Sequence, residues 1–167
     1  ADAERKTRAE AIRKAQEAAE AGMQVAIEMI RRARIASSGQ LILERDKLTS
    51  ERVQQRIAEV NLRYGCVAAH TIVSCGQHTC DPHEEGHGPL RAHQPIILDI
   101  FPRSQQTGYW GDITRTVVKG RVSERLALMH QTVLEGQSMA LKELREGANG
   151  RVIHQSIVDL FKSRGFV

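Results

Sequence analysis

The chain has 167 residues, of which 41% are hydrophobic and 26% are charged, a composition typical of a folded globular domain. Its longest apolar runs, such as residues 95–100, are far shorter than a membrane span, so we predict no membrane segment. Three cysteines, an odd number, argue against a disulfide framework and favour a reducing, cytoplasmic location. The net charge of +4 raises the question of nucleic-acid binding.

Basic and acidic residues alternate along the first predicted helix, residues 4–35, and do not form one basic block. The residues that alternate are Arg5, Lys6, Arg8, Arg13 and Lys14 with Glu4, Glu10 and Glu17. Apolar residues recur at helical spacing from Ile12 to Ile30 and mark one buried stripe. We therefore predict a salt-bridged amphipathic helix here and no nucleic-acid interface.

The middle of the chain predicts a short extended piece, a helix and three strands. The extended piece covers residues 40–44. The helix begins at the cap Thr49 and ends at Gly65, a residue type that suits the position after a helix. β-Branched and apolar residues predict strands at 68–75, 95–101 and 109–118. The polar residues 102–107 are few enough to join the last two strands as a hairpin.

Two further helices are predicted after the hairpin. Ser123 caps the first, which runs to about residue 144, and the second covers about residues 152–162. Phe166 and Val167 look like the first step of another strand. We therefore expect an α+β fold, an antiparallel sheet with helices packed on one face, in one truncated domain over residues 1–167.

Asp99 interrupts an apolar strand, and Asp112 follows thirteen residues later in the returning strand. A hairpin symmetric about Gln105 and Gln106 would place the two carboxylates directly opposite each other, with Cβ atoms about 5 Å apart. Carboxylates so close must share a proton or bind a cation. The alternative is that one of them pairs with Arg115 or caps a turn.

A competing site lies in the loop 76–89 and its flanks. Thiolates and imidazoles are zinc ligands, and Cys75, His78, Cys80 and His83 could supply four of them, with His87 as a further imidazole. The loop lacks a second Cys-x-x-Cys pair. A small structural zinc module is therefore a second interpretation of this region, beside ordinary polar loop residues.

Three segments carry a family resemblance: His83-Glu-Glu-Gly-His-Gly-Pro-Leu, Pro95-Ile-Ile-Leu-Asp99 and Gly108-Tyr-Trp-Gly-Asp112-Ile-Thr-Arg-Thr116. Together they resemble the creatinase/aminopeptidase (M24) metallopeptidase family, whose members have the pita-bread fold. The third segment is similar to the Xaa-Pro peptidase and prolidase branch. The resemblance covers nearly the whole chain, which would form the amino-terminal half of the catalytic domain with the metal-ligand hairpin at 95–118.

The resemblance implies a dinuclear centre of Mn, Co or Zn ions held by two Asp, one His and two Glu residues. Asp99 matches the aspartate that ligates one metal ion, and Asp112 matches the aspartate that bridges both. His83 matches the histidine that contacts the peptide substrate. Thr114 alternates with Asp112 along the strand. It is expected to orient a ligating carboxylate by donating a hydrogen bond to it, without binding the metal itself.

The ligating His and both Glu residues of the family have no counterpart after residue 118, where the glutamates lie on predicted helices. We therefore expect this chain alone to bind metal weakly or not at all and to be inactive. We also expect its exposed apolar face to be covered by the missing half of the domain or by self-association.

Two functions follow from the resemblance. The first is metal-dependent hydrolysis of amino-terminal Xaa-Pro bonds by the complete protein, as an aminopeptidase or dipeptidase. The alternative is a non-catalytic pita-bread module that binds a protein or nucleic acid. Retention of Asp99, Asp112 and His83 favours the peptidase, because a binding module does not need facing carboxylates.

Overall fold

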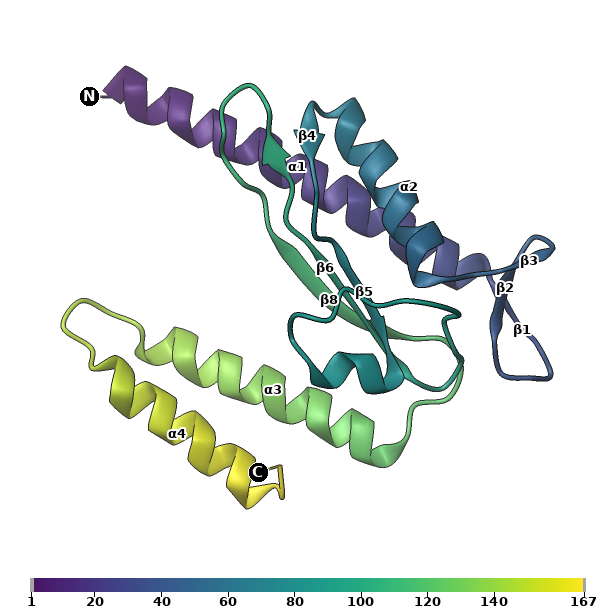
Figure 1. Cartoon of the computed structure of the whole chain (residues 1–167). Coiled ribbons are helices and arrows are strands. Elements are labelled where there is room, and N and C mark those ends of the chain that lie inside the picture. Colours follow the sequence, from purple (N-terminus) through teal and green to yellow (C-terminus); the bar gives the residue numbers. More distant parts are fainter. Residues whose placement is uncertain (1, 167) are drawn as a thin grey trace. The chain divides into compact units, whose positions relative to one another are not determined.

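The computed structural model describes residues 2–166 and divides the chain into two compact units that meet between Arg121 and Val122 (Figure 1). The first unit contains α1 (Asp2–Arg32), β1 (Arg34–Ile35), β2 (Leu41–Leu43), β3 (Asp46–Lys47), α2 (Ser50–Arg63), β4 (Cys66–Val67), β5 (Ile72–Cys75), the 3-10 helix η1 (Gly76–Cys80), β6 (Pro95–Ile100), β7 (Arg103–Ser104) and β8 (Ile113–Val118). The second contains α3 (Glu124–Glu143) and α4 (Gly150–Ser163). The predicted α+β class is confirmed.

The two long helices of the first unit pack against each other and form the base of its core. α1 buries Ala15, Ala19, Met23 and Ile30, as the apolar spacing predicts, but Ile12 and Ile27 of the predicted stripe are exposed. Its charged residues form the predicted surface pairs, Glu4 with Arg8 and Glu10 with Lys14. Gly22 does not interrupt the helix.

Gly22 lies where α2 crosses α1. A Cβ atom there would come within 3.1 Å of Ile57 Cγ2, so glycine allows the two helices to approach closely. The predicted cap of α2 is also confirmed, since Thr49 Oγ1 accepts a hydrogen bond from the Arg52 amide at 3.3 Å.

The central sheet has the order β5-β6-β8 and is antiparallel throughout. One face carries the buried side chains Val73, Ile96, Leu98 and Ile100, which pack against α1 and α2. β5 and β8 are both shorter than the strands predicted at 68–75 and 109–118, and Cys66–Val67, just before the first of these, pairs separately with β7 at the far end of the hairpin. Helices of this unit therefore cover one face of the sheet (Figure 1). Alternation along the strands places Asp99 and Thr114 on the opposite face.

The second unit is an antiparallel helical hairpin. Ser123 Oγ and Asn149 Oδ1 cap α3 and α4 by accepting backbone hydrogen bonds at 3.3 and 3.0 Å. Gly136 lies at the contact between the helices, 3.2 Å from Ile157 Cγ2 when a Cβ is placed on it. The strand expected to start at Phe166 depends on Val167, which lies outside the described residues. None of the helices that the structure describes is long and apolar enough to cross a membrane.

The loop between β5 and β6 is held tightly against β5. Val73 N donates to Glu85 O at 2.8 Å, and Ser74 Oγ donates to Glu84 O. Gly86 has φ +87°, and a Cβ atom there would lie 2.0 Å from Val73 O. Gly88, in the same loop, has φ +72° but open space around its Cα.

We expect Gly86→Ala to lower the free energy of unfolding by about 3 kcal/mol or more, because it combines a left-handed φ with a backbone overlap. Gly88→Ala has the φ penalty alone and is expected to cost about 1 kcal/mol. Urea denaturation of both variants measures the difference. Equal losses would show that the contact with Val73 is not rigid.

Candidate metal and substrate site

The sheet face opposite α1 and α2 carries three of the four predicted site residues. Asp99 pairs with Thr114 across β6 and β8, and Ile100 pairs with Ile113. The same register reappears nearer the tip, where Arg103 bridges to Trp110. Asp112 is therefore opposite Phe101, and it lies on the same face as Asp99 and Thr114, because side chains alternate along a strand.

The prediction that Asp99 and Asp112 lie directly opposite each other is wrong. The hairpin is centred between Gln106 and Thr107, because Ser104 accepts hydrogen bonds from Gly108 N (2.9 Å, carbonyl) and Thr107 N (3.2 Å, hydroxyl). This tip moves the register by two residues, which preserves the face but makes the carboxylates diagonal neighbours. Diagonal neighbours on a sheet are about 7–8 Å apart at Cα, close enough for two carboxylates to converge on one ion cluster.

Asp112 is positioned by α1. Gln16 Nε2 donates to Asp112 O at 3.0 Å, and Asp112 N donates to Gln16 Oε1 at 2.9 Å. Gly111 lies so near α1 that a Cβ atom would be 2.2 Å from Ala15 O. The backbone at Asp112 is therefore attached to a core helix, while its carboxylate stays exposed.

Asp99 is half-buried and lines a cavity of 370 Å³ together with Thr114, Ile97 and residues of the loop. Thr114 Oγ1 donates to Asp99 Oδ1 at 2.5 Å, so the threonine contacts this carboxylate. Within residues 2–166, neither Asp99 nor Asp112 forms an ion pair. Arg115, the alternative partner, donates to the carbonyl of Thr114 at 2.7 Å instead.

His83 stands apart from these groups. Its side chain is 94% exposed, and its Nδ1 is 4.0 Å from Asp81 Oδ1. Asp81 and Pro82, directly before it, line the Asp99 cavity together with Cys80. The loop therefore brings His83 to the rim of the cavity without placing it inside.

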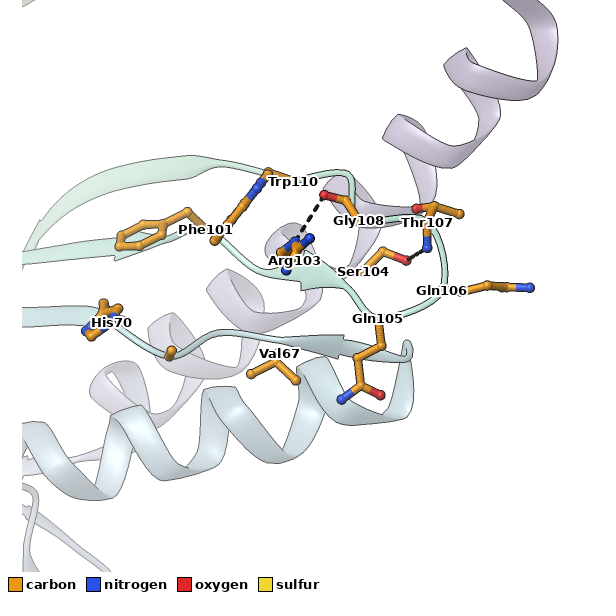
Figure 2. Close-up of a pocket in the computed structure, with 11 residues that line it drawn as sticks. Val67, His70, Phe101, Arg103, Ser104, Gln105, Gln106, Thr107, Gly108 and Trp110 are labelled. Carbon is orange, nitrogen blue, oxygen red and sulfur yellow. Dashed lines mark hydrogen bonds between the residues drawn. The ribbon is translucent and has the colours of Figure 1, made fainter. Parts of the chain in front are cut away.

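A second cavity of 590 Å³ lies between the hairpin tip and the segment that joins β4 to β5, and it is lined in part by Phe101, the residue that faces Asp112. Figure 2 shows Phe101, Trp110 and Arg103 around it, with His70 on the neighbouring segment. Trp110 is 56% exposed, and it alternates with Asp112 and Thr114 on one face. The sequence alone does not indicate this cavity, because its lining comes from segments about 35 residues apart.

The zinc module predicted from Cys75, His78, Cys80 and His83 is not formed. Cys75 lines a cavity with His78 and His87, whereas Cys80 lines the Asp99 cavity and His83 points into solvent. Burial raises the pKa of the Cys75 thiol, which disfavours the thiolate that zinc requires. Its sulfur accepts a hydrogen bond from Arg91 N at 3.3 Å.

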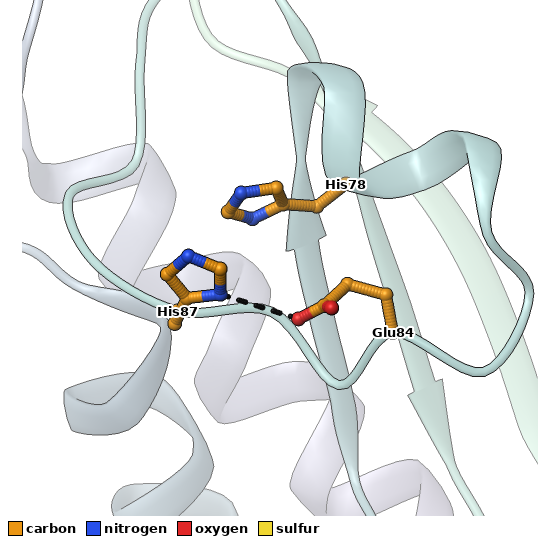
Figure 3. Close-up of side chains that lie close together, drawn as sticks. All are labelled: His78, Glu84 and His87. Atoms are coloured by element: carbon orange, nitrogen blue, oxygen red, sulfur yellow. Dashed lines mark hydrogen bonds and ion pairs between the residues drawn. The ribbon is translucent and has the colours of Figure 1, made fainter.

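The loop instead brings together His78, Glu84 and His87, whose candidate ligand atoms all lie within 4.8 Å of one another (Figure 3). The hydrogen bond from His87, at 3.2 Å, holds the pKa of the Glu84 carboxyl below its usual value, aided by the Gly86 amide. The sequence pattern indicates both histidines as candidate ligands but not Glu84. The only sequence signal for Glu84 was its spacing of three residues before His87.

The chemistry of Asp99 and Asp112 fits a divalent cation. Both supply carboxylate oxygens on one sheet face without a cationic partner among the described residues, the donor type that Mn, Mg, Co and Zn accept. Thr114 donates a hydrogen bond to Asp99, as residues that orient a metal ligand commonly do. Two carboxylates form part of a coordination sphere, and the other ligands would have to come from outside this face.

Comparison with known proteins identifies the fold and the family. The model of metallopeptidase family M24 matches residues 10–167. The chain is similar to a prolidase from Pyrococcus furiosus (23% identity, TM-score 0.75, covering 93% of this chain and 42% of that one). It is also similar to an X-Pro aminopeptidase from Thermotoga maritima MSB8 (23%, TM-score 0.72, 93% and 41%).

An uncharacterized peptidase of Staphylococcus aureus (strain MRSA252) is 22% identical over 125 residues, 73% of this chain and 35% of that relative. The chain thus spans well under half the length of the proteins it matches. The helices and antiparallel sheet described above are part of the pita-bread fold that these structures share. The chain belongs to metallopeptidase family M24.

Proposed function

We propose that this chain supplies two metal-ligating carboxylates and a substrate-contacting histidine to the active site of an Xaa-Pro peptidase, an aminopeptidase or a dipeptidase. The observation that carries the proposal is the arrangement of Asp99 and Asp112 on one sheet face, with no counter-ion among the described residues. Family membership supports a peptidase, and the similarity to a prolidase and an X-Pro aminopeptidase supports the choice of peptide bond.

Each site residue has a distinct task in this proposal. Asp99 and Asp112 hold two divalent ions, with Mn, Co or Zn as the cations. When bound, these ions polarise the peptide carbonyl and lower the pKa of a water molecule. Thr114 fixes the Asp99 carboxylate by donating to it, and Gln16 fixes the backbone of Asp112. His83 contacts the substrate near the scissile bond and handles a proton there.

The cavity at the hairpin tip would receive part of the peptide. Phe101 and Trp110 provide apolar contact, and Arg103 and Gln105 provide hydrogen-bond donors for backbone carbonyls. The remaining ligands would come from the part of the domain that this chain does not span. That part, or self-association of the chain, would also cover the exposed apolar face. The three free cysteines support the cytoplasmic location that the sequence predicts.

The proposal can be tested on the natural polypeptide that carries this sequence. We expect it to hold about two Mn, Co or Zn ions per active site and to release the amino-terminal residue from Xaa-Pro peptides faster than from matched Xaa-Ala peptides. The measurements are the intact mass of this polypeptide, its metal content and its rates of hydrolysis of the two kinds of peptide. A polypeptide that binds no stoichiometric metal at Asp99 and Asp112, and hydrolyses neither peptide, would instead be a non-catalytic member of the fold.

A further inference from the structure

We propose that His78, Glu84 and His87 form a second cation site, separate from the Asp99 and Asp112 centre, that takes a borderline divalent ion such as Zn²⁺. All three side chains come from the loop between β5 and β6, and they point toward one another (Figure 3). The site does not depend on the peptidase proposal, since none of its members is one of the residues assigned to that function.

The distances suit a single ion. The candidate ligand atoms lie within 4.8 Å of one another, and the two imidazole rings stack with centroids 4.1 Å apart. Tetrahedral zinc with bonds of about 2.0–2.1 Å places its ligand atoms about 3.3–3.5 Å apart. The ligand atoms would therefore have to approach one another by about 1–1.5 Å, with water as a fourth ligand. The stacked rings would also rotate out of their stack, because an imidazole nitrogen binds a metal ion in the plane of its ring.

A second observation points to a missing ligand. The Nδ1 atom of His78 is completely buried and has no hydrogen-bond partner in the described part of the chain. Buried polar atoms are normally paired, so an unpaired one requires an explanation. Figure 3 shows the ring of His78 facing His87 and Glu84, and an ion held between these three groups would satisfy this nitrogen.

The loop is built to hold these groups in place. Glu84 is fixed through its carbonyl by Ser74, and the next residue accepts a hydrogen bond from Val73 N at 2.8 Å. Gly88, directly after His87, donates to Glu51 Oε1 at 2.9 Å and accepts from Ser50 N at 3.0 Å. A ligand set attached to both a strand and a helix loses little freedom when it binds an ion.

The donor types select the ion. Two imidazole nitrogens with one carboxylate favour Zn²⁺ and other imidazole-binding ions over Mg²⁺ and Ca²⁺, which prefer oxygen ligands. The site also differs from the Asp99 and Asp112 pair in both its ligands and its elements. The bound ion would tie η1 to the segment that precedes β6 and thereby stiffen the loop that carries His83.

The test is zinc titration of the purified chain after chelation, by calorimetry, with Co²⁺ absorption as a spectroscopic check of nitrogen ligation. We expect one Zn²⁺ per chain at this site. His78→Gln and His87→Gln should each lower the zinc affinity about 100-fold or more. Removal of a residue that only orients a metal ligand already lowers metal affinity about 10- to 100-fold, and removal of the ligand itself should lower it further. The side chain of His87 is 68% exposed, so His87→Gln decides the matter even where His78→Gln disturbs folding.

Two controls show whether the zinc binds at this loop or elsewhere on the chain. His70 and Glu85 form an exposed pair at 2.8 Å that has no third candidate ligand within residues 2–166, so His70→Gln should leave the affinity within about twofold of the original. The double variant Asp99→Asn, Asp112→Asn should also retain zinc at the loop. Zinc affinity that is unchanged when His87→Gln is added to this aspartate double variant would overturn the proposal. Loss of zinc binding in the aspartate double variant alone, or a chain that takes up no zinc, would overturn it as well.

Discussion

Replacement of Asp99 by asparagine is expected to reduce the hydrolysis of Xaa-Pro peptides by about 1,000-fold or more, equivalent to about 4 kcal/mol of transition-state stabilisation. Asparagine has the shape of aspartate but lacks its charge, so the metal centre loses a strong ligand. The fold should be retained, because Thr114 Oγ1 can donate to the amide oxygen as it does to the carboxylate. Asp112→Asn is expected to have an effect of the same order.

The measurement is kcat/KM together with metal content, in the natural polypeptide that carries this sequence. Asp46→Asn is the matched control, since Asp46 is an exposed aspartate in β3, part of a different sheet. The control should keep full activity and metal content. An Asp99→Asn variant that retains both would contradict the assignment of Asp99 as a ligand.

Gly111→Ala is expected to lower the free energy of unfolding by about 3 kcal/mol or more, because the added methyl overlaps backbone atoms and not a movable side chain. A Cβ at this position meets Ala15 O at 2.2 Å, Ala15 C at 2.5 Å and Gln16 N at 2.8 Å. Relief of the overlap requires the hairpin to move away from α1. That movement would break the two hydrogen bonds between Gln16 and the backbone of Asp112, so metal affinity should fall as well.

Urea denaturation and metal titration measure the two consequences. Gly150→Ala provides the control, because Gly150 begins α4 and has open space at the Cβ position. That substitution should leave stability unchanged or raise it by up to about 1 kcal/mol. A Gly111→Ala chain as stable as the original would mean that the hairpin and α1 are not in rigid contact.

The helices were predictable because their signals are local. The apolar stripe of α1 and the caps Thr49 and Ser123 involve residues three or four positions apart, which a sequence displays directly. Strand boundaries were less accurate. Residues 68–71, Ala-Ala-His-Thr, were predicted as the start of a strand but lie outside β5, because strand limits depend on which partner is available for pairing.

The candidate site shows the same division. The sequence placed Asp99, Asp112 and Thr114 on one face, since alternation along a strand is a local property. It did not predict which residue faces Asp99, because the register depends on the conformation of the tip, where Ser104 binds both Thr107 and Gly108. A two-residue error of this kind moves a contact along the strand but does not change its face.

The sequence by itself determined the fold class, the family segments and the residue types that bring metal and peptide chemistry to this chain. Only the tertiary structure decided which of these residues meet. In the structure Cys75 and Cys80 line different cavities, and Glu84 lies close to His78 and His87. The backbone of Asp112 is hydrogen-bonded to α1 through Gln16. The physical reason is that such contacts depend on loop conformation and on the packing of segments far apart in the chain, whereas propensity, capping and alternation act between near neighbours.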